Sequence, residues 1–313
     1  MRKFKFLFIL FALALCNLTC KVDAVKKVYK TKHVIIFVVD GARYSETWGD
    51  STHQNIPFLY HTLLPQGIML SSFRNNGYTW TSAGHDAICT GNYEPLDNGG
   101  NELPSYPTIF QYWRKANDAP AEKAWIITSK DKLYVLSNTK DLDFQTKWMP
   151  RYDCGINGPL SGYRDDSITN LHVKNTLQQY HPDMMLVNYR EPDFSGHAGV
   201  WSNYIAGIRS TDHYISEVWA YLQNDPYYAG TTTIIVTNDH GRHLDSVLNG
   251  FVSHGDGCEG CRHVEFIAAG PDCKRNVISD LNYETVDIPR TVSELMGFPM
   301  PTGGGKVIRE ILR

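Results

Sequence analysis

The sequence predicts an α/β fold of three layers, with helices on both faces of a mainly parallel central sheet. Short apolar runs rich in β-branched residues recur along the chain, and segments with helical periodicity lie between them. This alternation is typical of a parallel sheet covered on both sides. Several runs also end in Asp or His, and polar sites of such sheets gather at the carboxyl ends of the strands. A chain of 313 residues can bury the core of such a fold.

The first expected strand is His33–Val39, a continuous apolar run that ends at Asp40-Gly41. An uninterrupted run of this kind is typical of a strand buried on both faces. Later runs predict further strands at Ala124–Thr128, Met184–Asn188, Thr232–Thr237 and Val264–Ala268.

The clearest expected helix is Asn203–Leu222, whose large apolar residues fall on one stripe. Asp86–Thr90 is expected to be a short helix. Segments rich in Gly, Pro and Asn predict loops at Asn92–Pro107, Trp148–Arg164 and Pro299–Gly305, before a closing strand or helix at Lys306–Arg313.

The N-terminal segment predicts a signal peptide at residues 1–24, followed by a single domain at residues 25–313. Basic residues precede the apolar run Phe6–Cys16, and Val22-Asp23-Ala24 offers small residues for cleavage. The run is shorter than the roughly 20 residues of a transmembrane helix, so no stable membrane span is expected after processing. The chain is expected to be exported to a periplasm or the extracellular space. A membrane anchor at Phe6–Leu18 and a lipoprotein acylated at Cys20 are the alternatives, the latter behind a poor lipobox.

Charge and cysteine content limit the partners. With 30 Lys and Arg against 33 Asp and Glu, the chain lacks the clustered cations that polymeric nucleic acid requires. Five cysteines follow the predicted signal peptide, and in an oxidising compartment Cys258-Glu-Gly-Cys261 predicts a local disulfide. Metal binding by this pair is the alternative, although the second CxxC of a zinc ribbon is missing.

Two segments combine residue types that bind metal. Asp193 and His197 lie four residues apart in an expected loop after a strand, and carboxylate and imidazole are both zinc ligands. Asp239 and His240 end another strand, where Gly241 permits a sharp turn. An Asx-turn with a solvated His, and an ordinary strand end, are the respective alternatives.

Three more residues extend this pattern. Asp40 ends the first strand, and His254 lies in a His-Gly-Asp loop, where His263 competes with it as a ligand. Thr81 stands at an expected helix start, where a hydroxyl most often caps the helix. Free backbone N–H groups at a helix start can also bind a phosphate, and a neighbouring metal would make the hydroxyl a nucleophile. Together, three carboxylates, three imidazoles and one hydroxyl suit two divalent ions roughly 4 Å apart that share a phosphate.

The order of these motifs resembles the alkaline phosphatase superfamily, and most closely its nucleotide pyrophosphatase/phosphodiesterase branch. The resemblance runs from about Lys32 to the end of the chain. Its motifs are Val38–Gly41, Thr81 ahead of Thr90-Gly91, Glu191–His197 with Gly199, Asn238–Gly241, His254–Asp256, Phe266–Pro271, and Val286–Thr291 with Leu295–Gly297.

The resemblance implies an alkaline-phosphatase-like fold with two zinc ions. It implies that Asp193, His197 and His254 bind one ion, and that Asp40, Asp239, His240 and the Thr81 oxygen bind the other. Thr81 would attack phosphorus to form a phospho-threonine, which water would then release. The His-Gly-Asp triplet and its distance to Phe266 favour His254 over His263. Manganese would tolerate the same ligands.

The segment around the nucleophile departs from the family pattern. Residues 77–85 replace the usual Pro-Thr-x-Thr-Phe-Pro-Asn-His, so that Ser82 remains an alternative to Thr81. The family's phosphate-contacting Asn has only Asn98 and Asn101 as candidates. Sulfatases need a Cys or Ser within a Cys-x-Pro-x-Arg motif to form their nucleophile. Cys89-Thr-Gly lacks this motif, so sulfatase activity is not expected.

The sequence therefore predicts a zinc-dependent phosphodiesterase or pyrophosphatase acting on a small-molecule phosphate ester. A phosphomonoesterase is the nearest rival, and would add a cation such as Arg43, Arg74, Arg190 or Arg242 beside the metals. A sugar-phosphate mutase would need an inserted second domain, which is not evident. An exported metal-binding protein without turnover is a further alternative, although Thr81 and Ser82 are both present. The sequence predicts neither the leaving group nor an oligomeric state.

Overall fold

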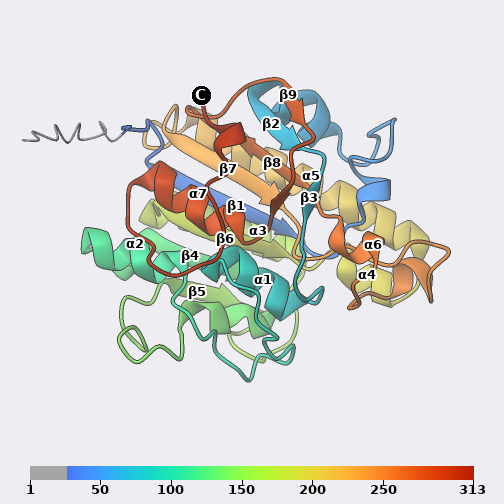
Figure 1. Cartoon of the computed structure of the whole chain (residues 1–313), viewed down its shortest axis with the longest axis horizontal. Coiled ribbons are helices and arrows are strands. Elements are labelled where there is room, and N and C mark those ends of the chain that lie inside the picture. The colour runs from blue at the N-terminus through green and yellow to red at the C-terminus, as the bar shows by residue number, and fades with distance from the viewer. Residues whose placement is uncertain (1–26) are drawn as a thin grey trace, which may run out of the picture.

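A computed structural model describes residues 27–313 of the chain (Figure 1). The predicted signal peptide at residues 1–24, the alternative anchor at Phe6–Leu18 and the alternative acylation site at Cys20 lie outside the described residues. No helix within residues 27–313 is both long enough and apolar enough to cross a membrane.

The centre of the fold is an eight-stranded sheet in the order β5-β4-β6-β1-β7-β8-β2-β9. Only β8 runs antiparallel to its neighbours, β7 and β2. The strands are β1 (His33–Val39), β2 (Gly67–Leu70), β4 (Ala124–Thr128), β5 (Arg151–Cys154), β6 (Met184–Tyr189), β7 (Thr232–Thr237), β8 (Phe266–Ala269) and β9 (Val277–Ser279). A separate two-stranded pair joins β3 (Phe73–Arg74) to β10 (Tyr283–Glu284).

Helices cover both faces of this sheet, as Figure 1 shows. The helices are α1 (Thr81–Thr90), α2 (Ile109–Asn117), α3 (Asp166–Tyr180), α4 (Asp193–His197), α5 (Trp201–Asn224), α6 (Glu259–Arg262) and α7 (Asp287–Met296). Short 3-10 or π segments lie at Tyr44–Glu46, Leu59–Leu63, Leu64–Gln66, Ala121–Lys123, Asp131–Ser137, Gly250–Val252 and Arg309–Ile311.

Side chains of β1 alternate between two hydrophobic cores, because successive residues of a strand point to opposite faces. Val34, Ile36 and Val38 belong to a core with side chains from α1, α2 and α7. Ile35, Phe37 and Val39 belong to a second core with side chains from α3 and α5. The predicted three-layer α/β architecture is confirmed.

The strand predictions agree with the structure to within two residues at each end, but four local predictions differ from it. The segment Trp148–Arg164 is not a continuous loop, because Arg151–Cys154 pairs with β4 as an edge strand. Asp193–His197 forms the short helix α4 rather than a loop. The helix expected at Asp86–Thr90 begins earlier, at Thr81. The closing segment contains only a 3-10 turn at Arg309–Ile311.

The cysteines correct another expectation. All five cysteines within the described residues are unbonded, so the expected disulfide between Cys258 and Cys261 is not formed in the structure.

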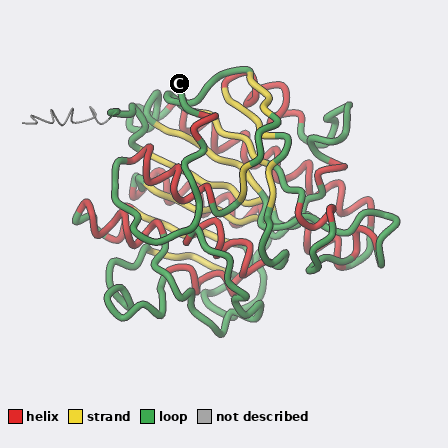
Figure 2. The backbone as a smooth tube through the Cα atoms, viewed as in Figure 1, coloured by secondary structure: helices red, strands yellow, loops and turns green. Residues whose placement is uncertain are grey.

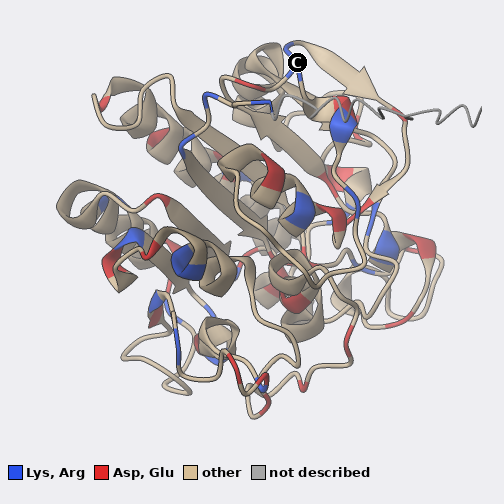
Figure 3. Cartoon of the chain, turned by 60° about the vertical axis from the view of Figure 1, so that its left-hand side comes forward, with Lys and Arg blue, Asp and Glu red and all other residues tan. Residues whose placement is uncertain are grey.

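Loops and charges are distributed unevenly over the molecule. Figure 2 shows loops forming the end of the molecule beyond β5, where Asn92–Pro107 runs without helix or strand as predicted. Figure 3 shows acidic and basic residues interspersed over helices and loops, while the strands of the sheet are largely uncharged. The charged and His side chains at the strand ends are therefore exceptions that call for a physical explanation.

Candidate metal centre

Three adjacent parallel strands deliver acidic residues to one edge of the sheet. Asp40 follows β1, Asp193 follows β6 at the start of α4, and Asp239 follows β7. β1 lies between β6 and β7 in the sheet, so the carboxyl ends of all three strands meet at this edge. All three carboxylates are buried, which requires a compensating charge or ligand.

The first candidate group joins Asp193, His197 and His254. The Nε2 atoms of the two imidazoles lie 3.1 Å apart, and each is 3.4 Å from Oδ1 of Asp193. A tetrahedral zinc ion with bonds of ~2.0–2.2 Å spaces its ligand atoms by roughly 3.3–3.6 Å. The three atoms therefore form one face of a site of the right size for zinc.

Local structure explains how this group meets. Residues four apart on a helix share a face, so the helical conformation of α4 aligns Asp193 with His197. Nδ1 of His254 lies 2.8 Å from the carbonyl oxygen of Thr79, and this contact turns Nε2 toward the group. A metal-binding imidazole usually has its second nitrogen held in this way.

The second candidate group joins Asp40, Asp239 and His240, which are fully buried. Nε2 of His240 lies 3.3 Å from Oδ2 of Asp239 and 3.5 Å from Oδ1 of Asp40, while its Nδ1 faces the carbonyl oxygen of Gly241 at 2.9 Å. Within residues 27–313, neither Oδ2 of Asp239 nor Nε2 of His240 has a hydrogen-bond partner. Buried polar atoms without a partner are costly, and a metal ion would satisfy both.

The two groups are neighbours. The ring of His240, from the second group, stacks on the ring of His254, from the first, with centroids 3.8 Å apart. The two groups are therefore in direct contact. The side chain of His197 is 53% exposed, and it marks the side on which the centre opens to solvent.

Burial and charge prepare these groups to bind metal. Burial lowers the pKa of His197 and of His240, and it lowers the pKa of His254 to about 2, so the imidazoles stay neutral with free lone pairs. Burial also raises the pKa of Asp40 to about 7, and the charge of Asp239 adds to this shift. Burial opposes ionisation of Asp193 too, but Lys130 and Arg242 outweigh it and hold the pKa of this carboxyl well below its usual range. Ligands must be deprotonated to bind a metal, and most of this centre already is.

Thr81 is the first residue of α1, is buried, and shares the partner Lys130 with one carboxylate of each group. Its Oγ1 accepts a hydrogen bond from Nζ of Lys130 at 3.0 Å. The neighbouring Ser82 donates its backbone N–H to Oδ1 of Asn98, while its own Oγ has no hydrogen-bond partner within residues 27–313. Asn98 therefore contacts the start of α1, whereas Asn101 bonds to Asp97 in an exposed loop.

Lys130 is the main residue of the centre that sequence analysis missed. It follows β4 by two residues, and its Nζ lies 2.9 Å from Oδ1 of Asp40 and 2.7 Å from Oδ2 of Asp193. It thus bridges one carboxylate of each group and also contacts Thr81. Its place two residues after the predicted strand Ala124–Thr128 was the one sequence cue, and the structure shows why it matters: β4 pairs with β6, so its end lies at the same edge.

Of the four arginines considered from the sequence, only Arg242 points into the centre. It is fully buried, and its guanidinium contacts Oδ1 of Asp193 and Nδ1 of His197. The others pair with acidic residues elsewhere: Arg43 with Glu46 and Asp245, Arg74 with Glu259, and Arg190 with Asp165.

Two further buried residues support the ligands. Nδ2 of Asn188 donates to Oδ2 of Asp40 at 3.0 Å, and Nδ1 of His85, which faces the carbonyl oxygen of Thr81 at 2.8 Å, lies 3.3 Å from Oδ2 of Asp239 without the geometry of a hydrogen bond. His263 takes no part, because its Nε2 lies 2.9 Å from the carbonyl oxygen of Ser71 and its ring stacks on Tyr44. This geometry agrees with the choice of His254 over His263.

Comparison with known proteins identifies the family. A family model described as sulfatase matches residues 32–298, which is most of the chain. The chain belongs to the sulfatase family. Among solved structures, a protein of the alkaline phosphatase superfamily from Vibrio parahaemolyticus has a TM-score of 0.64 at 13% identity, over 92% of this chain and 72% of that chain. The predicted alkaline-phosphatase-like fold is thereby confirmed, and this sulfatase-family chain carries candidate metal sites.

Two other solved structures are also similar to this chain. Phosphonate monoester hydrolase from Silicibacter pomeroyi has a TM-score of 0.64 at 14% identity, over 90% of this chain and 76% of that chain. Murine ectonucleotide pyrophosphatase/phosphodiesterase 5 has the same TM-score and identity, over 90% of this chain and 100% of that chain. A further structure of the murine protein is an inactive threonine-to-alanine variant in complex with AMP. At these identities the likeness establishes the fold.

Curated relatives match a shorter segment. A 2,3-bisphosphoglycerate-independent phosphoglycerate mutase of Brugia malayi is 27% identical over 139 residues, which are 44% of this chain and 24% of that protein. The corresponding mutase of Gracilaria tenuistipitata var. liui is 29% identical over 139 residues, with the same coverage. The chain thus spans about a quarter of the length of the curated relatives it matches.

Proposed function

We propose that this protein is a two-metal hydrolase of small phosphoric esters, with Thr81 as nucleophile and phosphodiesters as the preferred substrates. The observation that carries the proposal is the pair of ligand groups beside Thr81, each with atoms at the spacing of a metal site. Zinc suits the mixed carboxylate and imidazole ligands. Two bound ions would polarise the phosphoryl oxygens and favour ionisation of the Thr81 hydroxyl.

The chain's own residues account for the remaining chemistry. Oγ1 of Thr81 would give its proton to water and attack phosphorus as the bond to the leaving oxygen breaks, and the leaving oxygen would take a proton from water. Lys130 donates a hydrogen bond to Oγ1, and its positive charge stabilises that oxygen after the hydroxyl proton is lost. Water would then cleave the phospho-threonine, restoring the hydroxyl and releasing the phosphorylated product.

The contacts support Thr81 over Ser82. Only the Thr81 hydroxyl contacts Lys130, which in turn contacts a carboxylate of each group. The inactive threonine-to-alanine variant of the murine phosphodiesterase is consistent with a threonine nucleophile in this fold. Residues 77–85 also lack the Cys-x-Pro-x-Arg motif in which sulfatases form their nucleophile. Sulfate esters are therefore not among the proposed substrates.

Phosphomonoesterase activity is a second candidate, and Lys130 with Arg242 favours it. Two divalent ions and these two cations carry more charge than the three carboxylates compensate, so the loaded centre would remain cationic. A monoester carries more negative charge than a diester and would gain more from this excess. The mutase relatives share only a quarter of their length with this chain, which leaves intramolecular phosphate transfer less supported.

The test compares hydrolysis of bis-p-nitrophenyl phosphate with that of p-nitrophenyl phosphate, after treatment with EDTA and again after zinc is restored. Zinc-restored activity that favours the diester supports the leading proposal, and a preference for the monoester selects the second candidate. A metal-loaded protein that hydrolyses neither ester would contradict both candidates as tested and leave either a narrower substrate or a metal-binding protein without turnover.

A further inference from the structure

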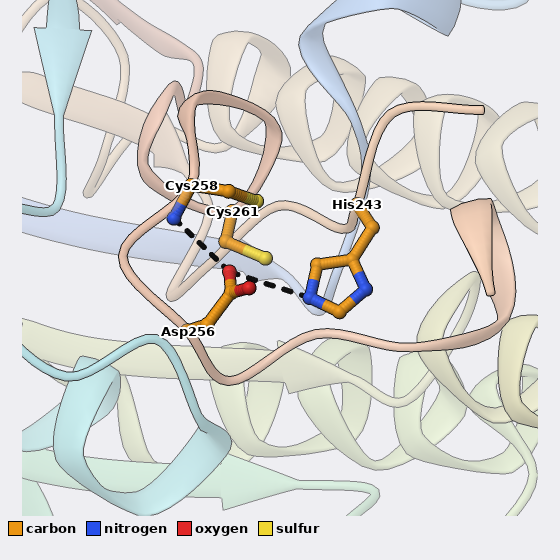
Figure 4. A group of neighbouring side chains, drawn as sticks. All are labelled: His243, Asp256, Cys258 and Cys261. Carbon is orange, nitrogen blue, oxygen red and sulfur yellow. Dashed lines mark hydrogen bonds and ion pairs between the residues drawn. The ribbon is translucent and has the colours of Figure 1, made fainter. Parts of the chain in front are cut away.

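We propose that His243, Asp256, Cys258 and Cys261 form a separate structural zinc site. Figure 4 shows the four side chains directed toward one another from two loops and the short helix α6. One potential ligand atom from each lies within 4.8 Å of every other. None of the four belongs to the two ligand groups beside Thr81.

The chemistry of the set is that of a structural zinc site. Two thiols, one imidazole and one carboxylate supply four ligands, and Cys258 and Cys261 have the C-x2-C spacing common in such sites. A tetrahedral zinc ion with bonds of ~2.0–2.3 Å spaces its ligands by roughly 3.3–3.8 Å, so closure requires movements of at most about 1 Å. Asp256 is half-exposed, which leaves it free to make such an adjustment.

His243 provides an independent indication of a ligand. It is 98% buried, and neither of its ring nitrogens makes a hydrogen bond to any residue from 27 to 313. Nε2 lies 3.3 Å from Oδ1 of Asp256, without the geometry of a hydrogen bond. Buried imidazoles are normally satisfied, and a metal ion between the two side chains would satisfy this one.

A disulfide would explain these observations less well. It would join Cys258 to Cys261 but would leave the buried ring of His243 without a partner, whereas a zinc ion uses all four side chains. The two thiols are unbonded in the structure.

The site would hold the loops that carry two ligands of the main centre. The backbone N–H of Gly241, next to His240, donates to the carbonyl oxygen of Cys261 at 2.8 Å. The N–H of His243 donates to Ser253, next to His254, at 3.0 Å. A Cβ on Gly260 would meet the carbonyl oxygen of Arg242 at 2.4 Å, so the turn between the two cysteines is pressed against the same strand end. A zinc ion here would therefore fix His240 and His254 relative to each other.

Cobalt substitution of the purified, reduced protein tests the site. The ligands beside Thr81 are oxygen and nitrogen atoms, so thiolate-to-cobalt charge-transfer absorption would report only the cysteine site. We expect this absorption in the unchanged protein, and we expect Cys258→Ser and Cys261→Ser each to abolish it. With zinc, each variant should bind one ion fewer than the unchanged protein.

The matched controls are Cys273→Ala, a buried cysteine elsewhere, and Glu259→Gln, an exposed change between the two cysteines. Both should keep the absorption. Reduced, unchanged protein that shows no thiolate absorption with excess Co²⁺ would overturn the proposal, and this measurement does not depend on the variants folding. Absorption that persists in both cysteine variants, or a Cys258–Cys261 disulfide in protein isolated without reductant, would overturn it as well.

Discussion

Nζ of Lys130 lies 3.0 Å from Oγ1 of Thr81 and bonds to Asp40 and Asp193 at the same time. One buried ammonium group thus links the proposed nucleophile to a carboxylate of each ligand group. Burial alone lowers the pKa of Lys130, but Asp193, Asp40 and Asp239 raise it by more, so the amine stays charged. The centre is therefore organised around a fixed cation as well as around its metal ligands.

Replacing Lys130 should reveal this dual role. Without metal, Lys130→Met leaves the buried Asp40 without its cation and leaves Asp193 with Arg242 alone, and breaking a buried ion pair costs about 3–5 kcal/mol. With zinc bound, the metal ions would compensate the carboxylates, so the loss of stability should be smaller. Chemical unfolding in EDTA and in zinc measures both values.

The matched control is Lys132→Met, since Lys132 is also buried but bonds to Asn98 rather than to the carboxylates. Equal destabilisation by Lys130→Met with and without zinc would show that Lys130 acts only through packing in the core.

Thr81→Ala should lower turnover by on the order of 10³-fold or more, because the attacking oxygen is removed. Metal content should change little, since the six carboxylate and imidazole ligands remain. Ser82→Ala should keep most of the activity. Steady-state kinetics with metal analysis tests both variants, and the reverse order of effects would assign the nucleophile to Ser82.

Asp239→Asn should weaken metal binding while preserving the shape of the side chain. Loss of a direct ligand charge should exceed the ~10–100-fold that removal of an outer-shell partner costs. Metal analysis should find one ion fewer than in the unchanged protein. Asp245→Asn is the control, because Asp245 lies on the same loop but is exposed and pairs with Arg43. Equal metal content in the two variants would argue against Asp239 as a ligand.

The sequence predicted the central strands because apolar, β-branched runs are local signals. The run at β1 shows directly in the composition of seven consecutive residues. The edge strand β5 was not predicted, because Arg-Tyr-Asp-Cys is polar and half-exposed, which is common at the edge of a sheet. Strand ends then located Asp40, Asp193 and Asp239 at one edge.

The remaining parts of the centre depend on tertiary contacts. The segment of α4 contains Gly196, which favours a loop in isolation, yet this glycine packs against the guanidinium of Arg242 and leaves no room for a Cβ. Lys130 gave no ligand-like signal, because a lysine after a strand is ordinarily solvated and only its partners show that it is buried. His243 was overlooked for the same reason, since its neighbours in space come from another loop.

Glu265 should make stability depend on pH independently of the metal centre. The residue is fully buried, and its Oε2 has no hydrogen-bond partner within residues 27–313. Burial raises the pKa of this carboxyl from 4.5 to about 8, and the charge of Asp212 adds to the shift. Between these values the folded protein holds a proton that the unfolded chain releases, so this group makes stability fall as pH rises through the window.

Glu265→Gln removes that titration and keeps the shape of the neutral side chain. Near the lower end of the window the variant and the unchanged protein should have the same free energy of unfolding. As pH rises, the variant should become the more stable of the two, by up to about 1.4 kcal/mol per pH unit. Chemical unfolding from pH 4.5 to pH 8 measures the difference between the two proteins, in which metal-linked effects common to both cancel. Glu259→Gln, an exposed change, should show no such trend. Parallel pH curves for Glu265→Gln and the unchanged protein would mean that Glu265 is already ionised in the fold.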